Sequence, residues 1–278
     1  MKKLLSEDLQ KKANEIRKDV LRMLLEAKSG HAAGSLGTIE IFTALYIAVM
    51  NHDPKKPDWE ERDRLVLSCG HVCPAQYAAM ARAGYFSLAK LKSYCKLGSP
   101  LQGHPERVRL PGIETTSGPL GCGLAQAAGI AYAARMDSAR FRVFCLASDG
   151  EHDEGNHWEA VAFAGKNNLA NLTLIIDRNN IQVDGHTEEV MPLEPLKAKY
   201  EAFNWHVLDI DGHNITEIID AIGHARAVYE NPTAIIAHTI PGKGVDFMEW
   251  DPAWHAKVPN SEQVKHALKD FRSLGGKI

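Results

Sequence analysis

Apolar and polar residues follow one another in two alternating patterns from about residue 118 to the end of the chain. Short apolar runs, such as 172–176 and 233–238, have the length and composition of buried strands. Longer segments with apolar residues at helical spacing separate these runs. The pattern predicts strands at 142–147, 172–176, 205–208 and 233–238, and helices at 121–134, 154–166, 193–203, 215–228 and 261–274.

Strands that are apolar on both faces and alternate with helices predict a parallel sheet covered by helices on both sides. The expected fold class is therefore α/β, with a doubly wound sheet. Ligands of such folds bind at the carboxyl ends of strands, where the strand order reverses. The segments to search for a site are 148–156, 177–185 and 239–255.

The first part of the chain has a different pattern, which predicts helices without strands. Ser6 precedes an amphipathic stretch that ends near Gly30, and further helices are expected at 39–49 and 74–83. We expect residues 1–278 to form a single domain, with a helical segment over about residues 1–110.

Composition limits the classes of function. Of 278 residues, 45% are hydrophobic and 24% are charged, as in ordinary soluble globular proteins. A formal charge of −3 gives no reason to expect nucleic acid or an anionic membrane surface as a partner. The sequence has no apolar run long enough for a membrane span and starts with a polar segment, so a cytoplasmic location is expected.

The five cysteines do not indicate a disulfide framework, because their number is odd and they are scattered. Cys69, His71 and Cys73 resemble half of a zinc knuckle, but no second pair follows at zinc spacing. We expect all five cysteines to be reduced thiols in a packed interior.

Polar residues follow two predicted strands at the edge where ligands bind. Asp149 and Gly150 come just after one strand, and Asn179 comes just after the next. Adjacent strands would bring a carboxylate and an amide oxygen together, which suits Mg²⁺ shared with a phosphate. Gly150 lets the backbone approach a diphosphate, and the helix start beyond it offers free N–H groups. An Asp-Gly pair alone is more often an ordinary turn, and Asn179 is what favours the metal site.

These residues resemble the thiamine-diphosphate motif, which begins Gly-Asp-Gly and ends in Asn. The resemblance implies thiamine diphosphate as a cofactor, held through Mg²⁺, with Ca²⁺ or Mn²⁺ as substitutes. It also implies that Asp149, Asn179 and the backbone carbonyl of Ile181 bind the metal. Val183 matches a position near the thiazolium ring.

Other segments resemble the transketolase family, in the same order and over nearly the whole chain. They are Ser29-Gly30-His31, the run from Arg62 to His71, Gly103-His104-Pro105-Glu106, the run from Thr116 to Gly123, and the run from Gly242 to Asn260.

The resemblance implies roles for four histidines. His31, His71, His104 and His255 match residues around the thiazolium ring and the donor sugar, where they bind hydroxyl groups and the diphosphate and move protons. His71 and His255 are among the expected cofactor contacts.

It also implies roles for four other residues. Gly118 and Leu120 match backbone that supports the aminopyrimidine, and Glu154 and Glu159 match acidic residues at a subunit interface, with Glu154 near the cofactor as well.

In transketolases the glutamate that activates the cofactor lies in the second domain, and this chain ends at Ile278, after the first. The resemblance therefore implies the amino-terminal subunit of a split transketolase. Its partner would be a carboxyl-terminal, pyrimidine-binding subunit, with two copies of each chain in the assembly. The implied reaction transfers a two-carbon ketol unit from a ketose phosphate to an aldose phosphate, with pentose-phosphate metabolism as the expected setting.

Departures from the family pattern keep other interpretations open. Ser148 stands where the motif has its first Gly, and Ala32-Ala33 stand where Pro-Gly is usual. Ser148 keeps open a non-catalytic scaffold subunit. The other alternative is a related thiamine enzyme, such as a deoxyxylulose-phosphate synthase or the alpha subunit of a 2-oxoacid dehydrogenase, which Gly103-His104-Pro105-Glu106 and the segment around Trp254-His255 disfavour.

Overall fold

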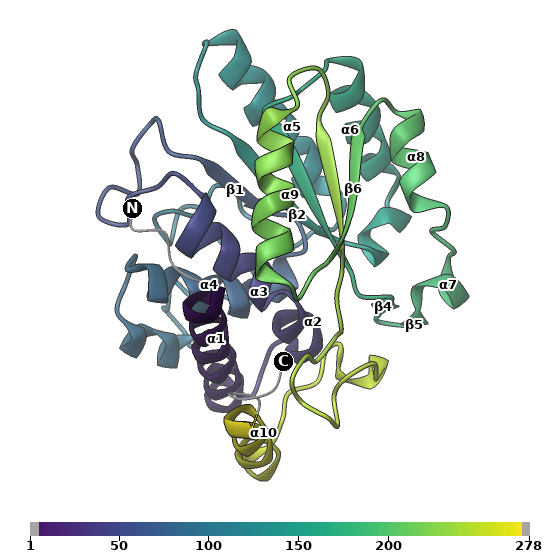
Figure 1. The fold of residues 1–278 in the computed structure, drawn as a ribbon. Coiled ribbons are helices and arrows are strands. Elements are labelled where there is room, and N and C mark those ends of the chain that lie inside the picture. The colour runs from purple at the N-terminus through teal and green to yellow at the C-terminus, as the bar shows by residue number, and fades with distance from the viewer. Residues whose placement is uncertain (1–5, 274–278) are drawn as a thin grey trace.

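A parallel sheet of five strands organises the computed structural model, which describes residues 6–273 (Figure 1). The strands lie in the order β1-β2-β3-β7-β6, and all neighbours pair in parallel. Their bounds are β1 Arg64–Leu67, β2 Val143–Ser148, β3 Leu172–Arg178, β6 His206–Asp211 and β7 Thr233–His238. A separate antiparallel hairpin, β4 Ile181–Gln182 and β5 Gly185–His186, directly follows β3.

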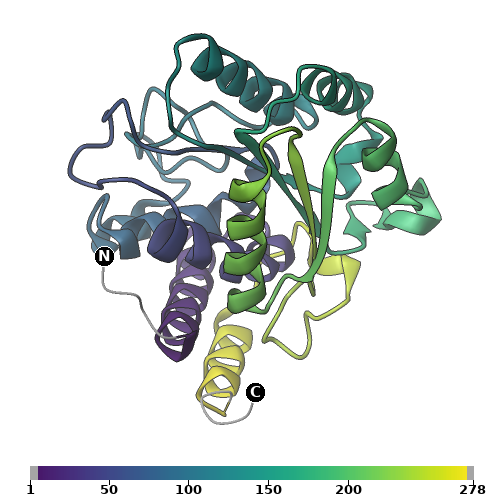
Figure 2. The same ribbon diagram turned by 45° about the horizontal axis from the view of Figure 1, so that its top comes forward.

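Helices cover both faces of this sheet. Figures 1 and 2 show α1 and α9 on one side and α5 and α6 on the other. The α-helices are α1 Ser6–Ala27, α2 Ala32–Gly37, α3 Ile39–Thr43, α4 Cys73–Ala83, α5 Cys122–Met136, α6 Gly155–Lys166, α7 Thr187–Val190, α8 Leu196–Ala202, α9 Ile215–Ala227 and α10 Ser261–Ser273. A π-helical turn, Ala44–Val49, continues α3, and 3-10 turns lie at Gly70–Val72, Leu88–Ser93, Gly150–Asp153 and Pro252–Trp254.

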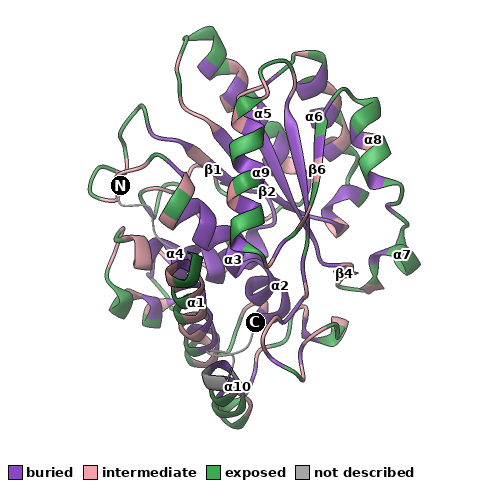
Figure 3. Cartoon of the chain, in the orientation of Figure 1, coloured by how far each residue is buried: buried purple, intermediate pink, exposed green. Residues whose placement is uncertain are grey.

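Side chains on the central strands alternate between two hydrophobic cores, as the two-residue period of a strand requires. On β2, Phe144 and Leu146 join the core that includes α1, α3, α4 and α9, whereas Val143 and Cys145 join the core that includes α5, α6 and α8. Every residue of β2 and β3 is buried, and Figure 3 shows the strands buried beneath helices whose outer sides are exposed. Burial on both faces holds the strand ends, and the loops that follow them, in fixed positions.

The predicted fold class is confirmed, and each predicted strand is present. Two strands are longer than expected: the one at 172–176 extends to Arg178, and the one at 205–208 becomes His206–Asp211. The prediction missed β1, and it placed one helix over 193–203 where α8 covers only Leu196–Ala202. The predicted helix end at residue 274 lies outside the described residues.

The cysteines are all free, but the expectation of a uniformly packed interior was wrong for two of them. Cys69, Cys73 and Cys145 are buried, while Cys95 and Cys122 are only half-buried. Within residues 6–273, no helix is both long enough and apolar enough to cross a membrane.

Candidate active site

The carboxyl ends of β2 and β3 lie side by side and carry the predicted metal ligands. The register pairs Ser148 with Asp177, so the residues that follow each strand emerge next to each other. Asp149 is completely buried at the end of β2. Its carboxylate accepts hydrogen bonds from the backbone N–H of Gly150 at 2.8 Å and of Asn180 at 2.6 Å. Asp149 therefore joins the turn after β2 directly to the turn after β3.

Asn179 is held by bonds to both of its amide atoms. Its Nδ2 donates to Asp177 Oδ2 at 2.7 Å, and its Oδ1 accepts from the backbone N–H of Ile181 at 2.9 Å. Asp177 also accepts a hydrogen bond from the hydroxyl of Thr239, which follows β7. The ends of three adjacent strands are thus joined through buried polar groups, and they hold Asn179 beside the turn that carries Asp149.

The charges at this edge suit a cation. Burial raises the pKa of Asp149 to about 6, against the opposing effect of Arg178, and burial also raises the pKa of Asp177 to about 7. Arg178 is the guanidinium that pairs with Asp149, at 3.2 Å, and it is shared with Glu188 and Glu194. A divalent cation bound here would favour the ionised form of these buried carboxyl groups.

The donor types fit a hard cation with oxygen ligands. The described part of the chain contains no group of three or more His, Cys, Asp or Glu side chains placed to hold a metal. The predicted set differs from such a group, because it combines the carboxylate of Asp149, the amide of Asn179 and the carbonyl of Ile181. Mg²⁺ is typically bound by one or two carboxylates and completes its octahedron with water and phosphate oxygens.

Gly150 leaves room beside the turn. A Cβ atom built on Gly150 would lie 3.0 Å from Cβ of Gln182, which is closer than ordinary van der Waals contact. The absence of a side chain at Gly150 lets the turn and the β4–β5 hairpin approach each other while the backbone N–H groups stay accessible to an anion.

The four predicted histidines form one cluster. The ring of His31 lies 5.2 Å from that of His71, 6.2 Å from that of His104 and 5.7 Å from that of His255, between ring centroids. His71 and His255 are also 5.2 Å apart. The cluster gathers residues separated by more than 200 positions in the chain. His71 follows β1, and His255 lies in the segment after β7, so the cluster belongs to the same edge of the sheet as Asp149.

These histidines are held in the neutral form at pH 7. Burial, with a further contribution from His255 and His104, lowers the pKa of His31 to about 4. The pKa of His71 lies well below its ordinary value for the same reasons, and burial lowers the pKa values of His104 and His255. A neutral imidazole has one N–H donor and one lone pair, so the cluster can both donate and accept at a ligand. Nδ1 of His31 is buried and has no hydrogen-bond partner.

A glycine contact brings the predicted pyrimidine-supporting loop up to this cluster. A Cβ atom on Gly70 would lie 2.7 Å from Ser117 Oγ, 3.0 Å from Cδ2 of His104 and 3.2 Å from the backbone nitrogen of Gly118. The residue before His71 must therefore be glycine for the loop to pack here. Gly118 itself adopts φ +153°, in the region that favours glycine.

The remaining predicted residues lie on the surface. Leu120 is 37% exposed, and Val183 is 70% exposed in the turn between β4 and β5. Glu154 directly precedes α6, Glu159 lies on that helix, and both are exposed. The structure thus gathers the four histidines in one cluster, places Asp149 and Asn179 at the ends of neighbouring strands, and leaves these four residues open to solvent.

Three buried charged residues at this edge escaped the sequence analysis: Asp177, Arg178 and Glu151. Asp177 and Arg178 could have been recognised from the sequence, because two charged residues continue the buried strand that begins at Leu172. Charged residues in a buried strand require partners, which marks them for attention. Glu151 could not have been recognised in this way, because its place in the sequence is that of an ordinary polar residue at the start of a helix.

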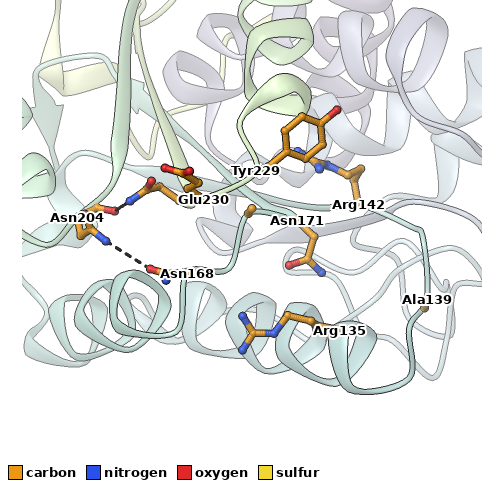
Figure 4. Close-up of a pocket in the computed structure, with 10 residues that line it drawn as sticks. Arg135, Ala139, Arg142, Asn168, Asn171, Asn204, Tyr229 and Glu230 are labelled. Atoms are coloured by element: carbon orange, nitrogen blue, oxygen red, sulfur yellow. Dashed lines mark hydrogen bonds between the residues drawn. The ribbon is translucent and has the colours of Figure 1, made fainter.

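A large open cleft of about 730 Å³ lies where β2 and β3 begin, at the end of the sheet opposite the predicted site. Figure 4 shows the residues that line it. Arg142 and Asn171 in its lining directly precede β2 and β3. Both arginines that line it donate to backbone carbonyls, Arg135 to that of Asn167 and Arg142 to that of Ala225. The cleft contains none of the residues predicted to act on a ligand.

Comparisons with known proteins identify the family to which this chain is similar. The profile of the family described as "Transketolase, thiamine diphosphate binding domain" matches residues 9–272. The chain is 43% identical to a 6-deoxy-6-sulfo-D-fructose transketolase subunit of Clostridium sp. (strain MSTE9), over 96% of this chain and 98% of the relative. It is 38% identical to an apulose-4-phosphate transketolase subunit of Phocaeicola vulgatus, over 95% of this chain and 94% of that relative.

Solved structures give the same result. The transketolase of Campylobacter jejuni matches with a TM-score of 0.90 and 36% identity, over 95% of this chain. The match covers 42% of the Campylobacter chain, so this protein spans about two-fifths of a transketolase of that length and nearly all of the subunit-sized relatives. The chain belongs to the transketolase family, of which it is a thiamine-diphosphate-binding domain.

Proposed function

We propose that this protein is the cofactor-binding subunit of a two-chain transketolase. It would bind thiamine diphosphate through Mg²⁺, with Ca²⁺ or Mn²⁺ as substitutes, and transfer a two-carbon ketol unit from a ketose phosphate to an aldose phosphate. The observation that carries this proposal is the junction of β2 and β3, where Asp149 bonds to the N–H of Asn180 and Asn179 is fixed by its own bonds.

In this proposal, the residues at the carboxyl ends of β2 and β3 bind the metal and the diphosphate. Asp149, Asn179 and the carbonyl of Ile181 hold the metal, and the N–H groups near Gly150 face the diphosphate. When bound, thiamine diphosphate supplies the carbanion chemistry by which a carbon–carbon bond beside a ketone is broken and made.

The histidine cluster acts on the sugars. Neutral His31, His71, His104 and His255 can donate hydrogen bonds to sugar hydroxyl groups and accept a proton from one of them. The low pKa values of the cluster keep the rings neutral, which favours hydrogen bonding to the sugar, and they make each ring a weaker base, because protonated rings at these distances would repel one another.

A partner chain is part of the proposal. Both subunit-sized relatives are named as subunits of transketolases. We propose a carboxyl-terminal, pyrimidine-binding partner that supplies the activating glutamate, with two copies of each chain. The surface near α5 and α6 is a suitable contact, since Met136 is 71% exposed and Phe163 is 44% exposed there, beside Glu154 and Glu159. Gly118 and Leu120 would support the pyrimidine, and Val183 would lie near the thiazolium ring.

Calorimetry with thiamine diphosphate and Mg²⁺, on this chain purified with its partner, tests the cofactor site. Even outer-shell changes at metal sites cost about 10- to 100-fold in affinity, so Asp149→Ala should weaken metal-dependent binding by more than about 100-fold. Asp209→Ala is the control, because it removes a carboxylate from β6 that is half exposed. No binding by the wild type would instead favour a non-catalytic scaffold.

Other expectations from the sequence remain predictions. They are a single domain over residues 1–278, a cytoplasmic location, and sugar phosphates of pentose-phosphate metabolism as substrates. Assays with ketose and aldose donors and acceptors that differ in their terminal anionic group would identify the sugar pair.

A further inference from the structure

Glu151 is a completely buried carboxylate in the 3-10 turn after Asp149. Its Oε1 accepts hydrogen bonds from the hydroxyl of Ser68 and, at 2.6 Å, from the backbone N–H of Gly121. Its Oε2 accepts a bond from the backbone N–H of Ser148 at 3.2 Å. These donors come from three segments, namely the residue after β1, the loop before α5 and the last residue of β2.

The carboxylate is held by neutral donors alone. In residues 6–273 no Lys, Arg or His side chain forms an ion pair with Glu151, in contrast to Asp149, which pairs with Arg178. Burial of a carboxylate without a counter-charge is unfavourable, and an apolar residue at this position would avoid that penalty. The three hydrogen bonds to Glu151 compensate for this penalty. The segments that these bonds connect therefore indicate the role of Glu151.

The three bonds connect two parts of the proposed site. The loop 118–121 carries Gly118 and Leu120, which would support the pyrimidine end of the cofactor. Ser148 directly precedes Asp149, which would hold the diphosphate end. We propose that Glu151 is a positioning residue that fixes the separation between these two parts, and so sets the distance spanned by the bound cofactor. This inference rests on the proposed function.

Close packing shows that the loop has little freedom to compensate for a lost bond. Gly121 adopts φ +77°, and a Cβ atom there would lie 2.2 Å from Oδ1 of Asn156. A Cβ atom on Gly123 would lie 2.4 Å from the side chain of Ser68, whose Oγ accepts the N–H of Gly123 at 3.0 Å. Ser68 and Glu151 therefore anchor the start of α5 against the ends of β1 and β2 at van der Waals contact.

Two ligands separate this role from a general effect on folding. Inorganic pyrophosphate with Mg²⁺ occupies only the diphosphate end, whereas thiamine diphosphate with Mg²⁺ occupies both ends. In Glu151→Gln the turn keeps the bonds of Asp149 to Gly150 and Asn180, but the amide has a single accepting oxygen, so its NH2 group faces the N–H of either Gly121 or Ser148 and one of the two connections is lost. We expect the Kd of thiamine diphosphate to rise by about tenfold or more, the effect of one lost bond to a charged group, and the Kd of pyrophosphate to rise by less than about threefold.

Two further variants complete the experiment, which uses this chain with its partner. Ser68→Ala removes one donor and keeps the carboxylate, so it should raise the Kd of thiamine diphosphate by about threefold, and it decides the matter if Glu151→Gln does not fold. Asp63→Asn is the control, because Asp63 is a buried carboxylate at the opposite end of β1 that accepts backbone N–H groups of Asn51 and Arg142, although it also pairs with Arg226. It should lower the melting temperature without changing either Kd.

The inference is overturned if the first two variants bind thiamine diphosphate like the wild type, or if Glu151→Gln weakens both ligands equally. If the wild type itself fails to bind thiamine diphosphate, the proposed function fails, which is a different result.

Discussion

Replacement of His31 by asparagine should change how the stability of the protein depends on pH. In the unfolded chain the pKa of His31 is 6.5, and in the folded protein burial and the neighbouring His255 and His104 lower it to about 4. Because the folded pKa is depressed, the stability gained by keeping the ring neutral is fully present above pH 6.5 and is lost as the pH falls toward 4. His31→Asn removes this titration.

The size of this change in the free energy of unfolding follows from the difference between the two pKa values of His31. Between pH 8 and pH 5, a group with these two pKa values loses about 2 kcal/mol of its contribution to the free energy of unfolding. The ring of His31 is only partly buried, which reduces the expected loss to about 1 to 2 kcal/mol. The free energy of unfolding should therefore fall by that much more in the wild type than in His31→Asn.

Urea unfolding of the purified chain at both pH values measures this difference. His206→Asn serves as the control for replacing a histidine by asparagine, because His206 is exposed at the start of β6 and lies outside the cluster. Equal pH dependence for the wild type and His31→Asn would refute the argument that the histidine cluster is kept neutral by burial.

Three more results are expected. Gly150→Ala would place a methyl group 3.0 Å from Cβ of Gln182, so overpacking should raise the Kd of thiamine diphosphate by about tenfold in calorimetry. Arg178→Ala leaves the buried Asp149 without its cation, and should lower the metal-free free energy of unfolding by about 3 kcal/mol in urea; a loss below about 1 kcal/mol would contradict the importance of that pair. The chain alone should show no ketol transfer in a coupled assay, and full activity without a partner would exclude the two-chain enzyme.

The local pattern of apolar and polar residues was sufficient to predict most of the fold. The apolar strands β2, β3 and β7 and the helices between them predicted a parallel sheet, because burial on both faces leaves a continuous apolar run. β1 was missed for a physical reason: Arg64–Leu67 has four residues, and Arg62 and Asp63 precede it. Its strand conformation depends on pairing with β2, which is distant in sequence. The π-helical turn at Ala44–Val49 likewise has no local signal, since its apolar residues suit an ordinary helix.

The candidate site also has one part that could be predicted from the sequence and one part that could not. Asp149 and Asn179 could be predicted because each stands directly after a recognisable strand, and parallel strands end at one edge. The partners of Arg178, and the three donors to Glu151, could not be predicted, because they depend on which loops pack together. Residues that connect several segments leave no periodic pattern in the sequence, even when they are as deeply buried as the core.

A crystal structure of the two-chain complex with thiamine diphosphate and Mg²⁺ tests the central claim. We expect an octahedral metal bound at about 2.0–2.1 Å by the carboxylate of Asp149, the amide oxygen of Asn179, the carbonyl oxygen of Ile181 and oxygens of the diphosphate. A cofactor whose metal has no contact with Asp149 and Asn179, or a diphosphate bound away from the ends of β2 and β3, would contradict it.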